Sequence, residues 1–135
     1  MKTDIDMTLL ERRDVPCVLH IDADDDAALV LATLLVPETE VVHAATLAEA
    51  RRLVARQHFA LVVLDPDLPD GDGMALLAEL KQSGSKTQAL LYSARQPGLR
   101  GPVYAFLPKP WTSPRQLWST VTRLLGIGAD ARVLH

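Results

Sequence analysis

The stretch FALVVLDPDLPDGDG, residues 59–73, joins a continuous apolar run to a segment rich in acids, prolines and glycines. An apolar run this short predicts a strand buried on both faces. The run ends on Asp65, and the composition of residues 66–73 predicts a loop. The sequence therefore places a carboxylate where a buried strand reaches the surface.

Apolar runs and amphipathic segments alternate on both sides of this stretch. Further strands are predicted for residues 15–21, 39–45, 87–94 and 103–109. Helices are predicted for residues 25–35, 46–57, 74–84 and 113–126, from their apolar stripes and capping residues. Apolar strands alternating with helices indicate an α/β fold, a doubly wound five-stranded parallel sheet with helices on both faces.

The composition limits the classes of protein that fit. A length of 135 residues, 48% of them hydrophobic, suits one domain with one core. A net charge of −3 without a Lys/Arg block argues against direct nucleic-acid binding. No apolar run approaches the roughly 20 residues that a membrane span needs, so no membrane association is expected. The single cysteine, Cys17, favours a reducing cytoplasm.

Four chemically matched residues end the predicted strands. Asp22 and Asp65 end the first and third strands, Ser93 ends the fourth and Lys109 ends the fifth. Ligands of doubly wound sheets bind beyond the carboxyl ends of the strands. Two acids, a hydroxyl and an amine are therefore expected to meet at one edge of the sheet.

These groups suit phosphoryl transfer to a carboxylate. An aspartate nucleophile needs a divalent cation to neutralise the incoming phosphoryl oxygens. Further acids hold that cation through hard oxygen ligands. A lysine and a hydroxyl can take the remaining phosphoryl oxygens.

Four quoted pieces carry a resemblance to a known family. Their order and spacing resemble the receiver domain of bacterial two-component response regulators over about residues 15–126, between a leader (1–14) and a tail (127–135). The pieces are VLHIDAD (18–24), LVVLDPDLPDGDG (61–73), LLYSA (90–94) and FLPKPW (106–111). The resemblance implies a flavodoxin-like strand order 2-1-3-4-5 and a phosphorelay signalling module, not an enzyme.

The resemblance also implies roles for individual residues. Asp65 is the phosphoacceptor, which takes its phosphoryl group from the histidine of a sensor kinase or phosphotransfer protein. Asp22, Asp65 and the main-chain carbonyl of Asp67 hold Mg²⁺. Ser93 and Lys109 follow the phosphoryl group.

A mobile aromatic switch completes the implied set. Phe106 stands at the position of the family's switch residue, although an aromatic in an apolar strand is equally well explained as core. Tyr104, two residues earlier, is the second candidate. His20, His43 and His58 are scattered along the chain, and the sequence offers no partner for any of them.

The first departure from the family is Ala23, which replaces the second of two adjacent acids at the end of the first strand. Mg²⁺ binding is therefore expected to be weak. Asp24 is interpreted as the cap of the following helix or, less favoured, as a substitute metal ligand. Asp25 and Asp26 are interpreted as first-turn acids favoured by the helix dipole.

The second departure is a shortened connection between Ser93 and Lys109. Its glycines and prolines, in RQPGLRGP (95–102), forbid a normal fourth helix, so this helix is predicted to be short or missing.

Two alternatives remain open. One is a degenerate receiver that acts as a phosphorylation-independent binding scaffold, which both departures favour. The minor one is an aspartyl-phosphate phosphatase of the haloacid-dehalogenase type, suggested by the DPD of residues 65–67. That class needs a later metal-binding acid pair, and the sequence has none.

Overall fold

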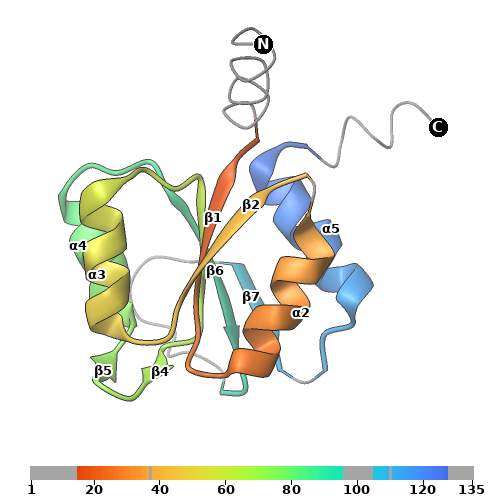
Figure 1. Ribbon diagram of the computed structural model, residues 1–135, viewed down its shortest axis with the longest axis horizontal. Coiled ribbons are helices and arrows are strands. Elements are labelled where there is room, and N and C mark those ends of the chain that lie inside the picture. Colours follow the sequence, from red (N-terminus) through yellow and green to blue (C-terminus); the bar gives the residue numbers. More distant parts are fainter. Residues whose placement is uncertain (1–14, 37, 96–104, 110, 128–135) are drawn as a thin grey trace, which may run out of the picture.

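A five-stranded parallel sheet forms the centre of the molecule (Figure 1). The computed structural model describes residues 15–36, 38–95, 105–109 and 111–127. Neighbouring strands lie in the order β2-β1-β3-β6-β7, and every pair is parallel. The strands are β1 (Cys17–Ile21), β2 (Glu40–Ala44), β3 (Leu61–Leu64), β6 (Gln88–Ser93) and β7 (Ala105–Pro108).

Helices cover both faces of the sheet. The described residues form four of them: α2 (Asp25–Leu35), α3 (Leu47–Arg56), α4 (Met74–Gln82) and α5 (Pro114–Leu125). Figure 1 shows α3 and α4 on one face and α2 and α5 on the other. The predicted doubly wound α/β fold and its strand order are confirmed, with β4 and β5 standing outside the main sheet.

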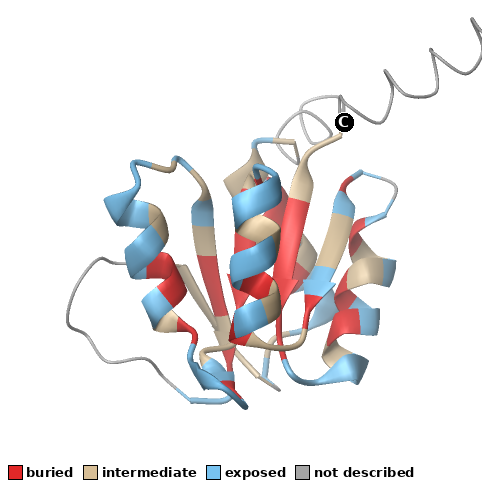
Figure 2. Cartoon of the chain, turned by 60° about the vertical axis from the view of Figure 1, so that its left-hand side comes forward, coloured by how far each residue is buried: buried red, intermediate tan, exposed pale blue. Residues whose placement is uncertain are grey.

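The alternation of side chains along each strand divides the core into two layers. Leu19 and Ile21 of β1 pack toward α3 and α4, where they contact a cluster that includes Leu76. Val18 points the other way and joins a cluster that includes Leu31. Figure 2 shows the resulting band of buried residues along the central strands. Both faces are apolar because a parallel sheet is covered on both sides.

Side chains next to each helix determine where it begins. Thr46 accepts a hydrogen bond from the backbone of Glu49 at 3.1 Å, which starts α3 as the sequence predicts. Ser113 and Gln116 form the corresponding capping box of α5. At its other end α5 stops at Gly126, whose left-handed backbone (φ 78°) suits glycine.

The segment after β3 differs from the predicted loop. It forms a small antiparallel pair, β4 (Asp67–Leu68) and β5 (Gly71–Asp72), because Gly71 adopts φ 150°, which allows the chain to turn back. At the turn, the Asp70 carboxylate accepts the backbone N–H groups of Leu47 and Ala48 at 2.8 and 2.9 Å. The segment is therefore joined to the first turn of α3.

Some predictions fall outside the described residues. These are the leader (1–14), the switch candidate Tyr104 and residues 128–135 of the tail. The predicted short or missing fourth helix falls there too, because residues 96–102 of the segment 95–102 are not described. The observed strands are also shorter than predicted: β1 begins at Cys17, two residues later than expected. Within the described ranges, no helix is both long and apolar enough to cross a membrane.

Replacing Gly73 with alanine tests how closely the segment after β3 packs on that strand. An added Cβ would lie 2.8 Å from Leu64 Cδ1 and 3.2 Å from Pro66 Cα, although the backbone itself is helical. We expect Gly73→Ala to lower the free energy of unfolding by about 1–3 kcal/mol through overpacking. Urea denaturation measures the change.

Leu64→Val removes the contacted methyl group and supplies the control. In the Gly73→Ala background it is expected to cost less than in the wild type, because it relieves the clash. Strict additivity of the two changes would show that the contact is not the cause. Gly84→Ala, where nothing lies within 4 Å of an added Cβ, should show no coupling to Leu64.

Candidate functional site

Two acids and an amine meet at the carboxyl edge of the sheet. Asp22 follows β1, Asp65 follows β3 and Lys109 follows β7. The Lys109 Nζ lies 2.5 Å from Asp22 Oδ2 and 2.9 Å from Asp65 Oδ2. One ammonium group therefore bridges the two carboxylates, and the three residues span four strands of the sheet, from β1 to β7.

Asp22 is the most deeply placed of the three, with its side chain 1% exposed. Burial alone would raise the pKa of the Asp22 carboxyl. The contacts with His20, Lys109 and the Asp24 N–H, together with the charge of Lys109, outweigh burial and hold the pKa below its usual range. Asp22 is thus a buried carboxylate that stays ionised because of its neighbours.

Lys109 carries the matching charge. Its side chain is 16% exposed, and burial alone would lower the pKa of the ammonium group. The hydrogen bonds to Asp22 and Asp65 and the charges of both carboxylates outweigh burial and raise the pKa. The ammonium group also lies 5.2 Å from the ring centroid of Tyr92, at cation–π distance. The sequence analysis did not single out Tyr92.

Ser93 lies at the same edge but makes different contacts. Its buried hydroxyl accepts the backbone N–H of Arg95 at 3.2 Å. Its carbonyl accepts the backbone N–H of Lys109 at 2.9 Å. Ser93 therefore joins the ends of β6 and β7, and its hydroxyl has no described contact with Asp65.

The side chain of Asp67 is occupied by an ion pair that the sequence analysis missed. Its carboxylate binds the guanidinium of Arg95, with Arg95 Nε 3.1 Å from Asp67 Oδ2. The hydrogen bond and the charge of Arg95 lower the pKa of Asp67. The Asp67 carboxylate is thus engaged by Arg95, and the role of its main-chain carbonyl as a cation ligand stays a prediction.

The remaining candidates are placed as follows. Ala23 is exposed at the edge. Asp24 caps α2, because its Oδ1 accepts the N–H of Asp26 at 2.9 Å. Phe106 is partly buried and packs against the core cluster on the α3 and α4 face. These positions favour the capping interpretation of Asp24, while its role as a substitute ligand stays a prediction.

Two histidines that the sequence left without partners lie side by side. His20 of β1 pairs in register with His43 of β2, and their ring centroids are 6.0 Å apart. His43 Nε2 donates to the Asp22 carbonyl at 2.8 Å. His20 is 0% exposed, and its Nε2 lies 3.4 Å from Asp22 Oδ2. Cross-strand register, which the isolated sequence does not display, brings both rings to Asp22.

The donor set suits a hard cation. Asp22 and Asp65 supply carboxylate oxygens, the ligands that Mg²⁺ prefers, and Mg²⁺ fills its remaining positions with water. Among the described side chains, no group of three or more His, Cys, Asp or Glu residues could hold a metal ion. In their donor chemistry the two carboxylates suit a hard cation that completes its shell with water.

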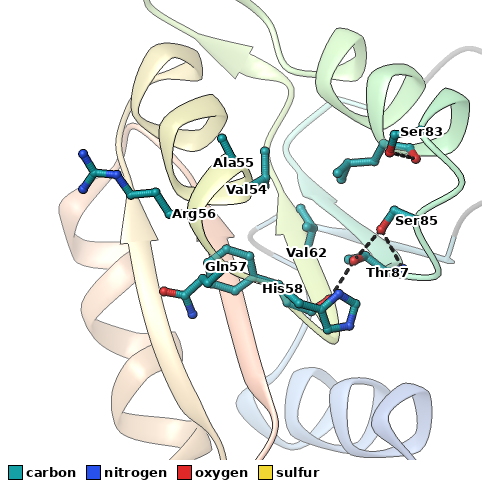
Figure 3. Close-up of a pocket in the computed structure, with 11 residues that line it drawn as sticks. Val54, Ala55, Arg56, Gln57, His58, Val62, Ser83, Ser85 and Thr87 are labelled. Atoms are coloured by element: carbon teal, nitrogen blue, oxygen red, sulfur yellow. Dashed lines mark hydrogen bonds between the residues drawn. The ribbon is translucent and has the colours of Figure 1, made fainter.

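A separate hollow lies at the opposite edge of the sheet. This pocket of about 330 Å³ is lined by residues of α3, α4 and the segments before β3 and β6, including Phe59, Ser85 and Thr87 (Figure 3). It contains none of the candidate site residues.

The buried His20 ring should make folding stability depend on pH. Burial, followed by the charges of His43 and Lys109, lowers the pKa of His20 despite the opposing effect of Asp22. The unfolded chain then binds more protons, so the free energy of unfolding should fall as pH drops below about 6.5. His20→Leu should flatten this fall in urea titrations at pH 7 and pH 5. A fall that persists in His20→Leu but is absent in His58→Leu would contradict the assignment.

Comparison with known proteins agrees with this geometry. A family model of the response regulator receiver domain matches residues 18–122. The chain is 32% identical over 117 residues to the protein PetR of Rhodobacter capsulatus, covering 82% of this chain and 48% of PetR. It is 40% identical over 52 residues to the transcriptional regulatory protein PmrA of Pectobacterium parmentieri, covering 38% of this chain and 23% of PmrA. It thus spans less than half the length of either relative.

A solved structure shows the same fold. The signal receiver domain of an HD domain-containing protein from Pseudomonas fluorescens superposes with a TM-score of 0.73 at 27% identity, over 83% of this chain and 95% of that one. The region that the family model matches, residues 18–122, contains the acid pair, the lysine and all of the sheet except Cys17. The chain belongs to the family of response regulator receiver domains, the signalling modules of two-component systems.

Proposed function

We propose that the chain is a phosphoacceptor module that receives a phosphoryl group on Asp65. The observation that carries this proposal is the bridge of Lys109 between Asp22 and Asp65. The bridge places a fixed positive charge beside the carboxylate that would attack phosphorus. Asp65 is partly exposed, with 15% of its side chain accessible, so a donor can reach it.

The transfer needs little beyond positioning and charge. An Asp65 oxygen attacks the phosphorus of a phosphohistidine on a partner kinase or phosphotransfer protein. The O–P bond forms as the P–N bond breaks, and the ring nitrogen takes the electron pair and then a proton. Bound Mg²⁺ would supply charge neutralisation for the phosphoryl oxygens. Lys109 supplies a second positive charge, since its ammonium can turn from the carboxylates to a phosphoryl oxygen.

A small acyl-phosphate donor tests the acceptor directly. Incubation with acetyl phosphate and Mg²⁺ should add one phosphoryl mass to the chain, with acetate as the leaving group. The increment should vanish in Asp65→Asn, since an amide is not a nucleophile here. Intact-protein mass spectrometry measures both.

Asp72→Asn is the matched control, because it changes a nearby acid of the same segment. It should be labelled like the wild type. Labelling that survives Asp65→Asn would remove Asp65 as the acceptor.

We further propose that the site binds Mg²⁺ weakly because Ala23 lacks a carboxylate. Restoring the acid in Ala23→Asp should tighten Mg²⁺ binding by roughly ten- to a hundredfold, equivalent to about 1–3 kcal/mol. Tryptophan fluorescence can follow the titration, since Trp111 stands two residues after Lys109. The variant should also be labelled faster.

Asp24→Asn tests the alternative ligand. If Asp24 holds the ion, this change should weaken Mg²⁺ binding and Ala23→Asp should have little effect. If Ala23 marks the missing ligand, Asp24→Asn should leave Mg²⁺ affinity nearly unchanged, and α2 should stay stable because Asn caps a helix about as well as Asp.

A binding scaffold that works without phosphorylation is the second candidate. The observation in its favour is that Lys109 already pairs with both carboxylates, so the chain itself neutralises one of the two negative charges at this edge. Failure of the wild type to label, with labelling gained in Ala23→Asp, would favour this candidate.

A further inference from the structure

His20 is a polar residue in an otherwise apolar position. Its side chain shares a sheet face with Val18 and lies next to Val63 of β3, and both valines are fully buried. His20 itself is 0% exposed, and neither ring nitrogen has a hydrogen-bond partner among the described residues. An unsatisfied buried polar group costs stability that an apolar side chain of similar size would not cost. Such a group is therefore a candidate for a functional role.

A carboxylate oxygen of the proposed acceptor site lies close to the ring. His20 Nε2 lies 3.4 Å from Asp22 Oδ2, longer than a normal hydrogen bond. A lone pair facing a carboxylate would be repelled, so the ring carries its proton on Nε2 and directs it at Asp22. At rest the same oxygen already accepts from Lys109 Nζ at 2.5 Å.

The arrangement gives Asp22 two donors for one oxygen. If Asp65 gains a phosphoryl group, the new negative oxygens attract Lys109, which already contacts Asp65 at 2.9 Å. Asp22 Oδ2 then loses its principal partner while it stays 1% exposed. Oδ1 keeps the Asp24 N–H at 2.9 Å, but a buried carboxylate oxygen that loses its donor is unfavourable.

We propose that His20 is a positioning residue that serves as the reserve donor for Asp22, taking over its Oδ2 when Lys109 turns to a phosphoryl group on Asp65. The contact of 3.4 Å shortens to an ordinary hydrogen bond in that state. His43 complements this role, because its hydrogen bond to the Asp22 carbonyl fixes the backbone that the carboxylate extends from. This inference rests on the proposed function of Asp65.

A phosphoryl analogue separates this role from a structural one. Beryllofluoride with Mg²⁺ is titrated into the wild type, His20→Leu and His20→Gln, and urea denaturation measures the stability of each. His20→Leu should be as stable as the wild type or more stable at pH 7, because it removes unsatisfied nitrogens. It should nevertheless bind beryllofluoride about tenfold more weakly, while His20→Gln, which keeps an N–H donor, should recover most of the affinity.

Two further measurements make the test specific. In an Asp22→Asn background, His20→Leu should change beryllofluoride affinity much less, because the charge that needs the reserve donor is gone. A ¹⁵N-labelled wild type should show a hydrogen-bonded His20 Nε2 proton that shifts downfield on binding. His58→Leu, at the far edge of the sheet, should bind like the wild type.

The outcomes distinguish the two proposals. A wild type that binds no beryllofluoride and takes no label overturns the proposed function, and this inference with it. A wild type that binds normally, with His20→Leu equal to it in affinity, overturns the reserve-donor role alone. Equal effects of His20→Leu with and without Asp22 would also overturn it.

Discussion

The ammonium group of Lys109 is the interaction on which the carboxyl edge of the sheet depends. Two ionised carboxylates from neighbouring strands face each other there, one of them almost without solvent. Two negative charges this close would repel each other strongly in a medium less polarisable than water. The positive charge of Lys109 between them makes the net electrostatic interaction of the three groups attractive. The parallel sheet makes this possible, because β1, β3 and β7 all end at the same edge. The fold therefore brings the lysine to the two carboxylates whose repulsion it offsets.

Those parts of the structure that depend on local sequence patterns could be predicted from the sequence. Apolar strands alternating with amphipathic helices imply a parallel sheet, and strand ends of a parallel sheet converge. The meeting of Asp22, Asp65 and Lys109 follows from those two statements alone. The starts of α3 and α5 could be predicted in the same way from the capping residues Thr46 and Ser113, because a cap bonds to backbone groups only a few residues away.

The features that sequence reasoning missed depend on register and on distant pairing. His20 and His43 are 23 positions apart in the chain, and only the alignment of β1 with β2 puts their rings together. The ion pair of Arg95 with Asp67 likewise joins segments that follow different strands. The short β4–β5 pair was taken for a loop because its residues are individually typical of turns. For the histidines and the ion pair the deciding partner lies outside the window from which a local pattern is read, whereas the β4–β5 partners are only three to five positions apart.

The contact of Asp70 with α3 has a consequence for how the molecule opens. Two successive amides at the start of α3 depend on a carboxylate that belongs to the turn between β4 and β5. Opening of that turn therefore releases these two amides at the same time, while the Thr46 cap still holds the amide of Glu49. In hydrogen exchange, the amides of Leu47 and Ala48 report on a turn more than twenty residues away, and their protection lasts only as long as the Asp70 carboxylate stays in place.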